Sequence, residues 1–208
     1  MIGATSVQTA RAVVSERQDP KATLRAWLDG PWAQEAAAGD PEIFGMPAEP
    51  FTLESRQWVD VARRRAREER GEVVLVRDGP RWWRTAPGLG FAQGEEPESS
   101  IDAAVILGLW VDPRPLAGLL ELAPAGDSTA LGRPARTLTA TADRDAGYAG
   151  DLAPLGWGAD RWELVIDAET GVLLATYAYV GDVVFRHVEA TEIELNSELD
   201  DALFRPPG

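Results

Sequence analysis

The chain has 208 residues, a hydrophobic fraction of 45% and a formal net charge of −14 at pH 7. This size and balance predict one folded domain spanning residues 1–208, and the acidic charge argues against nucleic acid as a partner, because phosphate binding depends on Lys and Arg. The sequence has no Cys, which excludes disulfides, zinc ribbons and thiol catalysis, and it has a single His, His187.

The first 20 residues lack the apolar run of a signal peptide, and no stretch of the sequence approaches the roughly 20 apolar residues of a membrane span. We therefore expect a cytoplasmic protein without a membrane span. A chain whose export signal had been trimmed would have the same sequence.

Residues 1–50 are predicted to form an N-terminal helical segment. Its clearest helix begins at Asp19-Pro20, an N-cap followed by Pro at the first helical position. Leu24, Trp27 and Leu28 share one face of this helix, so we expect that face to pack against the rest of the domain.

Residues 51–208 are predicted to hold the sheet and the helices that plug it. The β-branched run 72–77, the turn at 78–80 and the run 81–84 indicate a hairpin. Residues 57–70 have both helical and strand features, and we favour a strand because Val59, Val61 and the arginines that follow alternate at a period of two.

Two apolar segments, residues 101–110 and 113–122, are predicted to be short helices buried against the sheet. Strands follow at 136–141, 161–167, 172–179 and 183–195. The turns Ala168–Gly171 and Gly181-Asp182 join the last three strands into an antiparallel meander.

Four stretches carry a resemblance to a known family: residues 74–84 (VLVRDGPRWWR), the apolar segment ending at Val111-Asp112-Pro113, residues 131–144, and residues 162–207. Together they resemble the LolA-like and RseB-like superfamily of lipoprotein carriers and sigma-E regulators, in the form common in actinobacteria. The resemblance implies an α+β, mainly β fold: a curved antiparallel half-barrel whose concave face is covered by helices and, in exported relatives, receives lipid acyl chains.

Large aromatic and apolar side chains are the candidate ligand contacts, because they offer extensive apolar surface at little entropic cost. The candidates are Trp58, Trp83, Trp110, Leu119, Trp162 and Tyr177. Core packing is the competing interpretation for each of them. Trp82 and Trp83 are adjacent in a strand and must point to opposite faces, so one of the two is expected to be exposed, or else covered by a helix or a partner.

Residues 56–84 contain nine Arg and five acidic residues, in contrast to the acidic remainder of the chain. This asymmetry predicts that Arg63, Arg65 and Arg67 bind an acidic protein partner. The alternative is that the arginines line the convex face and pair across strands with glutamates, for which the candidates are Glu163, Glu189, Glu192 and Glu194.

No catalytic residue, metal site or cofactor is predicted. His187 lies on a strand, and no nucleophile elbow of the G-x-S-x-G type is present. The DAETG sequence at 167–171 is better explained as a hairpin turn than as a metal loop.

The sequence thus leaves three hypotheses. The first is a non-catalytic protein that binds an apolar or lipid-like ligand on the concave face. The second is a regulatory module that contacts an acidic partner through its Arg-rich strands. An enzyme is the third and weakest.

Overall fold

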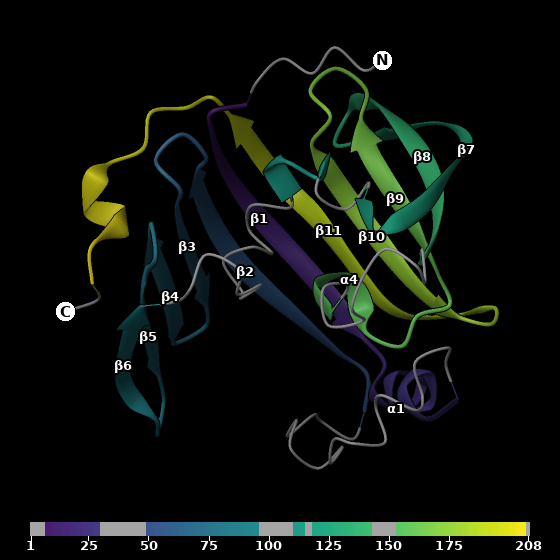
Figure 1. Ribbon diagram of the computed structural model, residues 1–208, viewed down its shortest axis with the longest axis horizontal. Coiled ribbons are helices and arrows are strands. Elements are labelled where there is room, and N and C mark those ends of the chain that lie inside the picture. The colour runs from purple at the N-terminus through teal and green to yellow at the C-terminus, as the bar shows by residue number, and fades with distance from the viewer. Residues whose placement is uncertain (1–6, 30–48, 96–109, 115–117, 143–152, 207–208) are drawn as a thin grey trace.

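The chain folds around one antiparallel sheet of 11 strands, in the spatial order β6-β5-β4-β3-β2-β1-β11-β10-β9-β8-β7 (Figure 1). The computed structural model describes residues 7–29, 49–95, 110–114, 118–142 and 153–206. The strands are β1 (Thr9–Gln18), β2 (Phe51–Asp60), β3 (Arg65–Arg70), β4 (Val73–Asp78), β5 (Arg81–Ala86), β6 (Gly90–Glu95), β7 (Leu120–Ala130), β8 (Arg133–Ala142), β9 (Arg161–Asp167), β10 (Leu173–Val180) and β11 (Val183–Leu195). The helices are α1 (Pro20–Asp29), α4 (Ala153–Gly156) and the short 3-10 helix η4 (Asp201–Phe204).

The first strand lies at the centre of this sheet, between β2 and β11 (Figure 1). The prediction that residues 1–50 form a helical segment is therefore wrong for Thr9–Gln18. One partner strand of β1, β11, lies far away in sequence, and the other, β2, follows a long connection. The Arg and Glu residues of β1 also obscure the alternation of apolar and polar residues that is typical of a strand. Strand formation here depends on tertiary pairing more than on local preference.

The run at residues 57–70 is extended, as predicted, but it forms two strands rather than one. A turn at Val61–Arg64 separates β2 from β3, and Arg64 adopts a left-handed backbone conformation with φ 54°. The Asp60 carboxylate accepts a hydrogen bond from the Arg63 backbone N–H at 3.0 Å and closes this turn. Arg63 thus lies in the turn, whereas Arg65 and Arg67 lie on β3.

The hairpin β4–β5 and the meander β9–β10–β11 agree with the predicted elements. In the DAETG turn, the Asp167 carboxylate accepts hydrogen bonds from the Thr170 N–H and hydroxyl, and Gly171 has φ +76°. The helix predicted for 113–122 is wrong at its end, because Leu120 begins β7 and pairs with Ala142. A bulge between Pro124 and Gly126 interrupts the alternation of side chains in this edge strand, so the sequence pattern did not indicate a strand.

Helix α1 begins where the sequence predicts, with the Asp19 carboxylate accepting from the Lys21 and Ala22 N–H groups. It packs against β10 and β11, and of the predicted face only Trp27 takes part in packing, with its ring centroid 5.4 Å from that of Trp157. Ala26 is fully buried, whereas Leu24 and Leu28 are exposed. At this contact the backbone of Gly158 approaches the backbone of Ala26 closely.

These elements confirm the predicted mainly β half-barrel: the sheet is curved, and its two edges, β6 and β7, remain apart. Helices α1 and α4 and the segment at Trp110–Val111 pack on the concave side, where Leu155, Trp162 and Leu164 form the centre of the main hydrophobic core. Most of the predicted plug helix 101–110 lies outside the described residues. No helix in the described ranges is long and apolar enough to cross a membrane.

A Gly158→Ala substitution tests the contact between α1 and the α4 turn. A Cβ at Gly158 would lie 2.6 Å from the Ala26 backbone, whereas a Cβ at Gly181 would meet nothing within 4 Å. Both glycines have positive φ, so Gly181→Ala is a matched control for backbone strain. We expect Gly158→Ala to lower the free energy of unfolding by about 2 kcal/mol more than the control, measured by urea denaturation. Equal losses would show that α1 does not depend on this contact.

Candidate functional site

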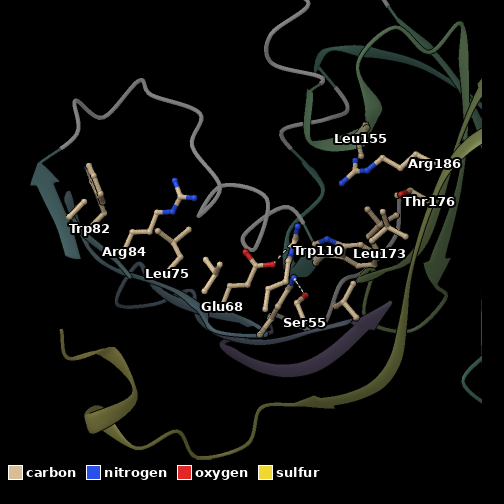
Figure 2. Close-up of a pocket in the computed structure, with 16 residues that line it drawn as sticks. Ser55, Glu68, Leu75, Trp82, Arg84, Trp110, Leu155, Leu173, Thr176 and Arg186 are labelled. Carbon is tan, nitrogen blue, oxygen red and sulfur yellow. Dashed lines mark hydrogen bonds and ion pairs between the residues drawn. The ribbon is translucent and has the colours of Figure 1, made fainter. Parts of the chain in front are cut away.

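A cavity of about 540 Å³ opens on the concave face of the sheet (Figure 2). Strands from both halves of the sheet form its floor, and Trp110 and Leu155 lie over it. The lining residues are Val14, Ser55, Gln57, Glu68, Arg70, Val73, Leu75, Trp82, Arg84, Ala92, Trp110, Leu155, Leu173, Thr176, Arg186 and Val188. The cavity therefore combines an apolar wall with a small number of charged groups.

Strand alternation and register place the lining residues of β2 to β6. Glu68 lies opposite Gln57 on one side and Leu75 on the other, and Leu75 in turn lies opposite Arg84. Arg84 is paired in register with Ala92 on the edge strand. Side chains on one face of a strand repeat every second residue, so Arg70, Val73 and Trp82, each two residues from a member of this row, lie on the same face.

The polar part of the floor is an ion-pair cluster around Glu16. Its carboxylate accepts a hydrogen bond from Arg186 Nε at 2.8 Å and lies 3.6 Å from Arg70 Nη2. Arg70 Nη2 also donates to Glu68 at 3.0 Å. Burial alone would raise the pKa of Glu16, but the two arginines hold it below its ordinary value. The Glu16 carboxylate is thus ionised at neutral pH.

Trp82 forms the outer end of the cavity wall, and its ring lies over a glycine of the neighbouring strand. A Cβ at Gly94 would lie 2.8 Å from the Trp82 indole, so the ring lies flat against the Gly94 backbone. Gly94 is the register partner of Trp82 on the neighbouring edge strand. The absence of a side chain at Gly94 in β6 therefore leaves room for this aromatic ring.

The structure brings one of the six predicted ligand contacts, Trp110, into this cavity. Trp162 and Leu119 belong to the adjacent core, where Trp162 Nε1 donates to the Leu155 carbonyl at 3.1 Å. Trp58, Trp83 and Tyr177 alternate with lining residues along their strands and therefore face away from the cavity. Their role in ligand binding stays a prediction.

Sequence reasoning did not identify Trp82, Arg70, Arg84 and Arg186 as lining residues. The turns at Gly71 and Gly79, both with positive φ, do predict which residues of β3, β4 and β5 share a face. Which of the two faces is concave depends on the curvature of the whole sheet, and no local pattern encodes it. Of the pair Trp82 and Trp83, both half-buried, Trp82 faces the cavity.

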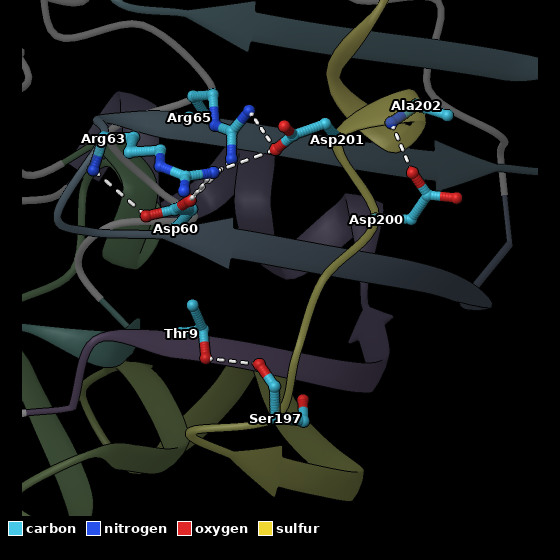
Figure 3. A network of polar contacts seen from close by, with 8 residues as sticks. All are labelled: Thr9, Asp60, Arg63, Arg65, Ser197, Asp200, Asp201 and Ala202. Carbon is cyan, nitrogen blue, oxygen red and sulfur yellow. Dashed lines mark hydrogen bonds and ion pairs between the residues drawn. The ribbon is translucent and has the colours of Figure 1, made fainter.

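On the convex face, the three predicted partner-binding arginines contact the chain's own C-terminal segment. Figure 3 shows two of them, Arg63 and Arg65, beside Asp201. Arg63 and Arg65 each form an ion pair with Asp201 at 2.9 Å, and Arg65 also pairs with Asp60 at 2.7 Å. Arg67 donates to the Leu203 carbonyl at 3.0 Å and pairs with Glu69. These acidic partners differ from the four glutamates proposed above for cross-strand pairing.

The aromatic ring of Phe204 completes this C-terminal contact. The ring is buried, and the Arg65 guanidinium lies 4.4 Å from its centroid. Trp58 and Trp83 flank the same region, because Trp58, Arg67, Val76 and Trp83 form one row across β2 to β5. The Arg-rich strands therefore hold η4 against the sheet.

His187 stacks on Tyr177 with ring centroids 4.2 Å apart, and its Nε2 lies 3.4 Å from the Glu189 carboxylate. That nitrogen is buried and has no hydrogen-bond partner among the described residues. Burial lowers the pKa of His187, against the opposing effect of Glu189. In the described ranges, no group of three or more His, Asp or Glu side chains is arranged to hold a metal ion.

Several solved structures resemble this chain. An uncharacterized conserved protein from Thermus thermophilus matches at 12% identity and a TM-score of 0.54, over 98% of this chain and 87% of that one. The MucA/MucB complex of Pseudomonas aeruginosa matches at 16% identity and 0.53, over 96% and 56%. The lipoprotein LppX of Mycobacterium tuberculosis matches at 11% identity and 0.51, over 93% and 89%.

Structural similarity at these low sequence identities shows the fold alone. Our chain spans just over half the length of the protein that it matches in the MucA/MucB complex. No protein-family model and no curated protein matches the sequence.

The pKa of His187 can be measured directly, because it is the only His in the chain. We expect its imidazole resonance, followed by NMR against pH, to titrate below the ordinary value of about 6.5. Since the folded-state pKa is lowered, the unfolded chain binds the proton first, and this group reduces stability as the pH falls below about 6.5. Tyr177→Ala exposes the ring and should raise its pKa, whereas the control Tyr179→Ala should not. A wild-type midpoint at or above the ordinary value would contradict the burial described here.

Proposed function

We propose that this chain, which has the half-barrel fold of the LolA-like and RseB-like superfamily, is a non-catalytic binding protein that holds an apolar or lipid-like ligand in its concave face. The observation that carries this proposal is the cavity of about 540 Å³ with its apolar wall. This volume lies in the usual range for small-molecule sites, roughly 300–1,000 Å³.

The apolar wall gives such a ligand its driving force. Leu75, Leu173 and Val188 face the same space as Trp110, and each Å² of apolar surface removed from water contributes about 25 cal/mol. The charged groups in the floor disfavour collapse of the cavity, because full burial of Arg70 and Glu68 would cost their hydration. A ligand with a hydrocarbon chain fits this cavity, because the wall is apolar and the charged groups in the floor disfavour its collapse.

Binding of a protein partner is the second candidate, since MucB has been solved in complex with MucA. For this chain, a partner that used Arg63, Arg65 and Arg67 would compete with Asp201 for the same guanidinium groups. Such a partner would therefore displace η4 from the sheet.

A substitution that fills the cavity tests the first candidate. Leu75→Trp places a bulky ring on the cavity face, and the matched control Val74→Trp places the same ring on the opposite face of β4. We expect Leu75→Trp to weaken binding of a neutral naphthylamine dye by at least about tenfold, measured by fluorescence titration, while the control retains binding. Circular dichroism would verify that both variants fold.

Organic extraction of the wild-type protein should also recover a lipid-like molecule that is absent from the Leu75→Trp extract. Failure of the wild type to bind the dye, together with an empty extract, would overturn the proposal.

Charge reversal tests the second candidate. Replacing Arg63, Arg65 and Arg67 by Glu should abolish capture of an acidic partner in a pull-down, because like charges repel. Asp201→Ala is the matched control: it removes the internal competitor, leaves the arginines in place and should retain or strengthen capture. An unchanged set of captured proteins in the triple variant would exclude this surface.

A further inference from the structure

Three arginine side chains line the cavity, and two of them are neutralised within the protein. Arg186 pairs with Glu16 at 2.8 Å, and Arg70 pairs with Glu68 at 3.0 Å. Each of these carboxylates is therefore committed to a neighbouring guanidinium. Among the described lining residues, no carboxylate is therefore left unpaired for a cationic ligand.

Arg84 is the third arginine, and no ion pair or hydrogen bond joins it to another residue in the part of the chain that the structure describes. Its register partners, Leu75 and Ala92, are both uncharged. Glu68 lies two strands away across the sheet, roughly 10 Å at the usual strand spacing. Among the described residues, Arg84 is thus the one cavity arginine that is not paired with a carboxylate.

The rest of the wall places this charge at one end of an apolar surface. Trp82 and Arg84 lie together near the edge of the sheet, while Leu155, Leu173 and Trp110 lie toward its centre (Figure 2). Leu75 lies between these two ends, next to Arg84. A charged group at one end of an apolar surface matches the shape of an amphiphile.

We infer that the ligand of this cavity is an anionic amphiphile, whose carboxylate or phosphate headgroup pairs with Arg84 while its hydrocarbon chain lies along Leu75 toward Leu155. This inference rests on the proposed function and adds the class of headgroup. A guanidinium presents a planar fork of N–H donors that matches carboxylate and phosphate oxygens in a bidentate arrangement. The positive charge of Arg84 on an otherwise apolar part of the wall favours an anionic headgroup over a neutral one.

Three probes with the same hydrocarbon chain separate the headgroup from the tail: dodecanoate, dodecyl phosphate and dodecanol. The experiment measures their affinities for the full chain by calorimetry below the micelle-forming concentrations. We expect wild-type protein to bind at least one of the two anions roughly tenfold more tightly than dodecanol. The preferred anion identifies the headgroup as carboxylate or phosphate, and the preference should shrink with added salt.

Arg84→Gln should remove the preference for the anion and leave the affinity for dodecanol unchanged. Arg81→Gln is the matched control, because Arg81 lies on the same strand, faces the opposite side and pairs with Glu95. This control should retain the preference.

Equal affinity of the wild type for all three probes would overturn the headgroup inference and leave the proposed function standing. A preference that survives in Arg84→Gln, or that is lost equally in Arg81→Gln, would overturn the role of Arg84. Absence of binding by all three probes would overturn both proposals.

Discussion

The pairing of β1 with β11 is the constraint on which the rest of the structure depends. It joins two runs of antiparallel strands, β1 to β6 and β7 to β11, into one sheet, with partners running from Ala10 and Leu195 to Gln18 and Arg186. Most β-strand contacts in this sheet join neighbours in sequence, but this pair joins the two ends of the fold. It also brings Glu16 beside Arg186, and β3 adds Arg70 to the same cluster. The floor of the cavity therefore exists only when both halves are joined.

The ion-pair cluster in this floor disfavours filling of this part of the concave face by apolar side chains, because the charged groups would lose their hydration. Glu16 is 8% exposed, and its lowered pKa means that it stays charged at neutral pH. Ionised side chains at this depth keep their pairs and resist further dehydration. The apolar core of Trp162, Leu164 and Leu173 continues on the β9–β10 side, while the β3–β5 side carries the charged residues. Ligand binding and core packing thus use adjoining parts of one face.

The sequence predicted those parts of the fold that local signals determine. The Gly and Asp turns identified the β4–β5 hairpin and the C-terminal meander, and Asp19-Pro20 identified the start of α1. The failures share a different cause. The position of β1, the inward orientation of Trp82 and the docking of Phe204 under Arg65 all depend on contacts between residues distant in sequence. The Arg-rich stretch was expected to meet acidic groups, and the structure supplies several of them from within the chain.

The most direct test of this account is to locate a bound hydrocarbon chain in solution. With isotope-labelled dodecanoate and methyl-labelled protein, the account predicts nuclear Overhauser contacts from the chain to the methyl groups of Leu75, Leu155 and Val188, which line the cavity. Contacts confined to exposed apolar residues outside the cavity, such as Leu131 and Val184, would contradict it.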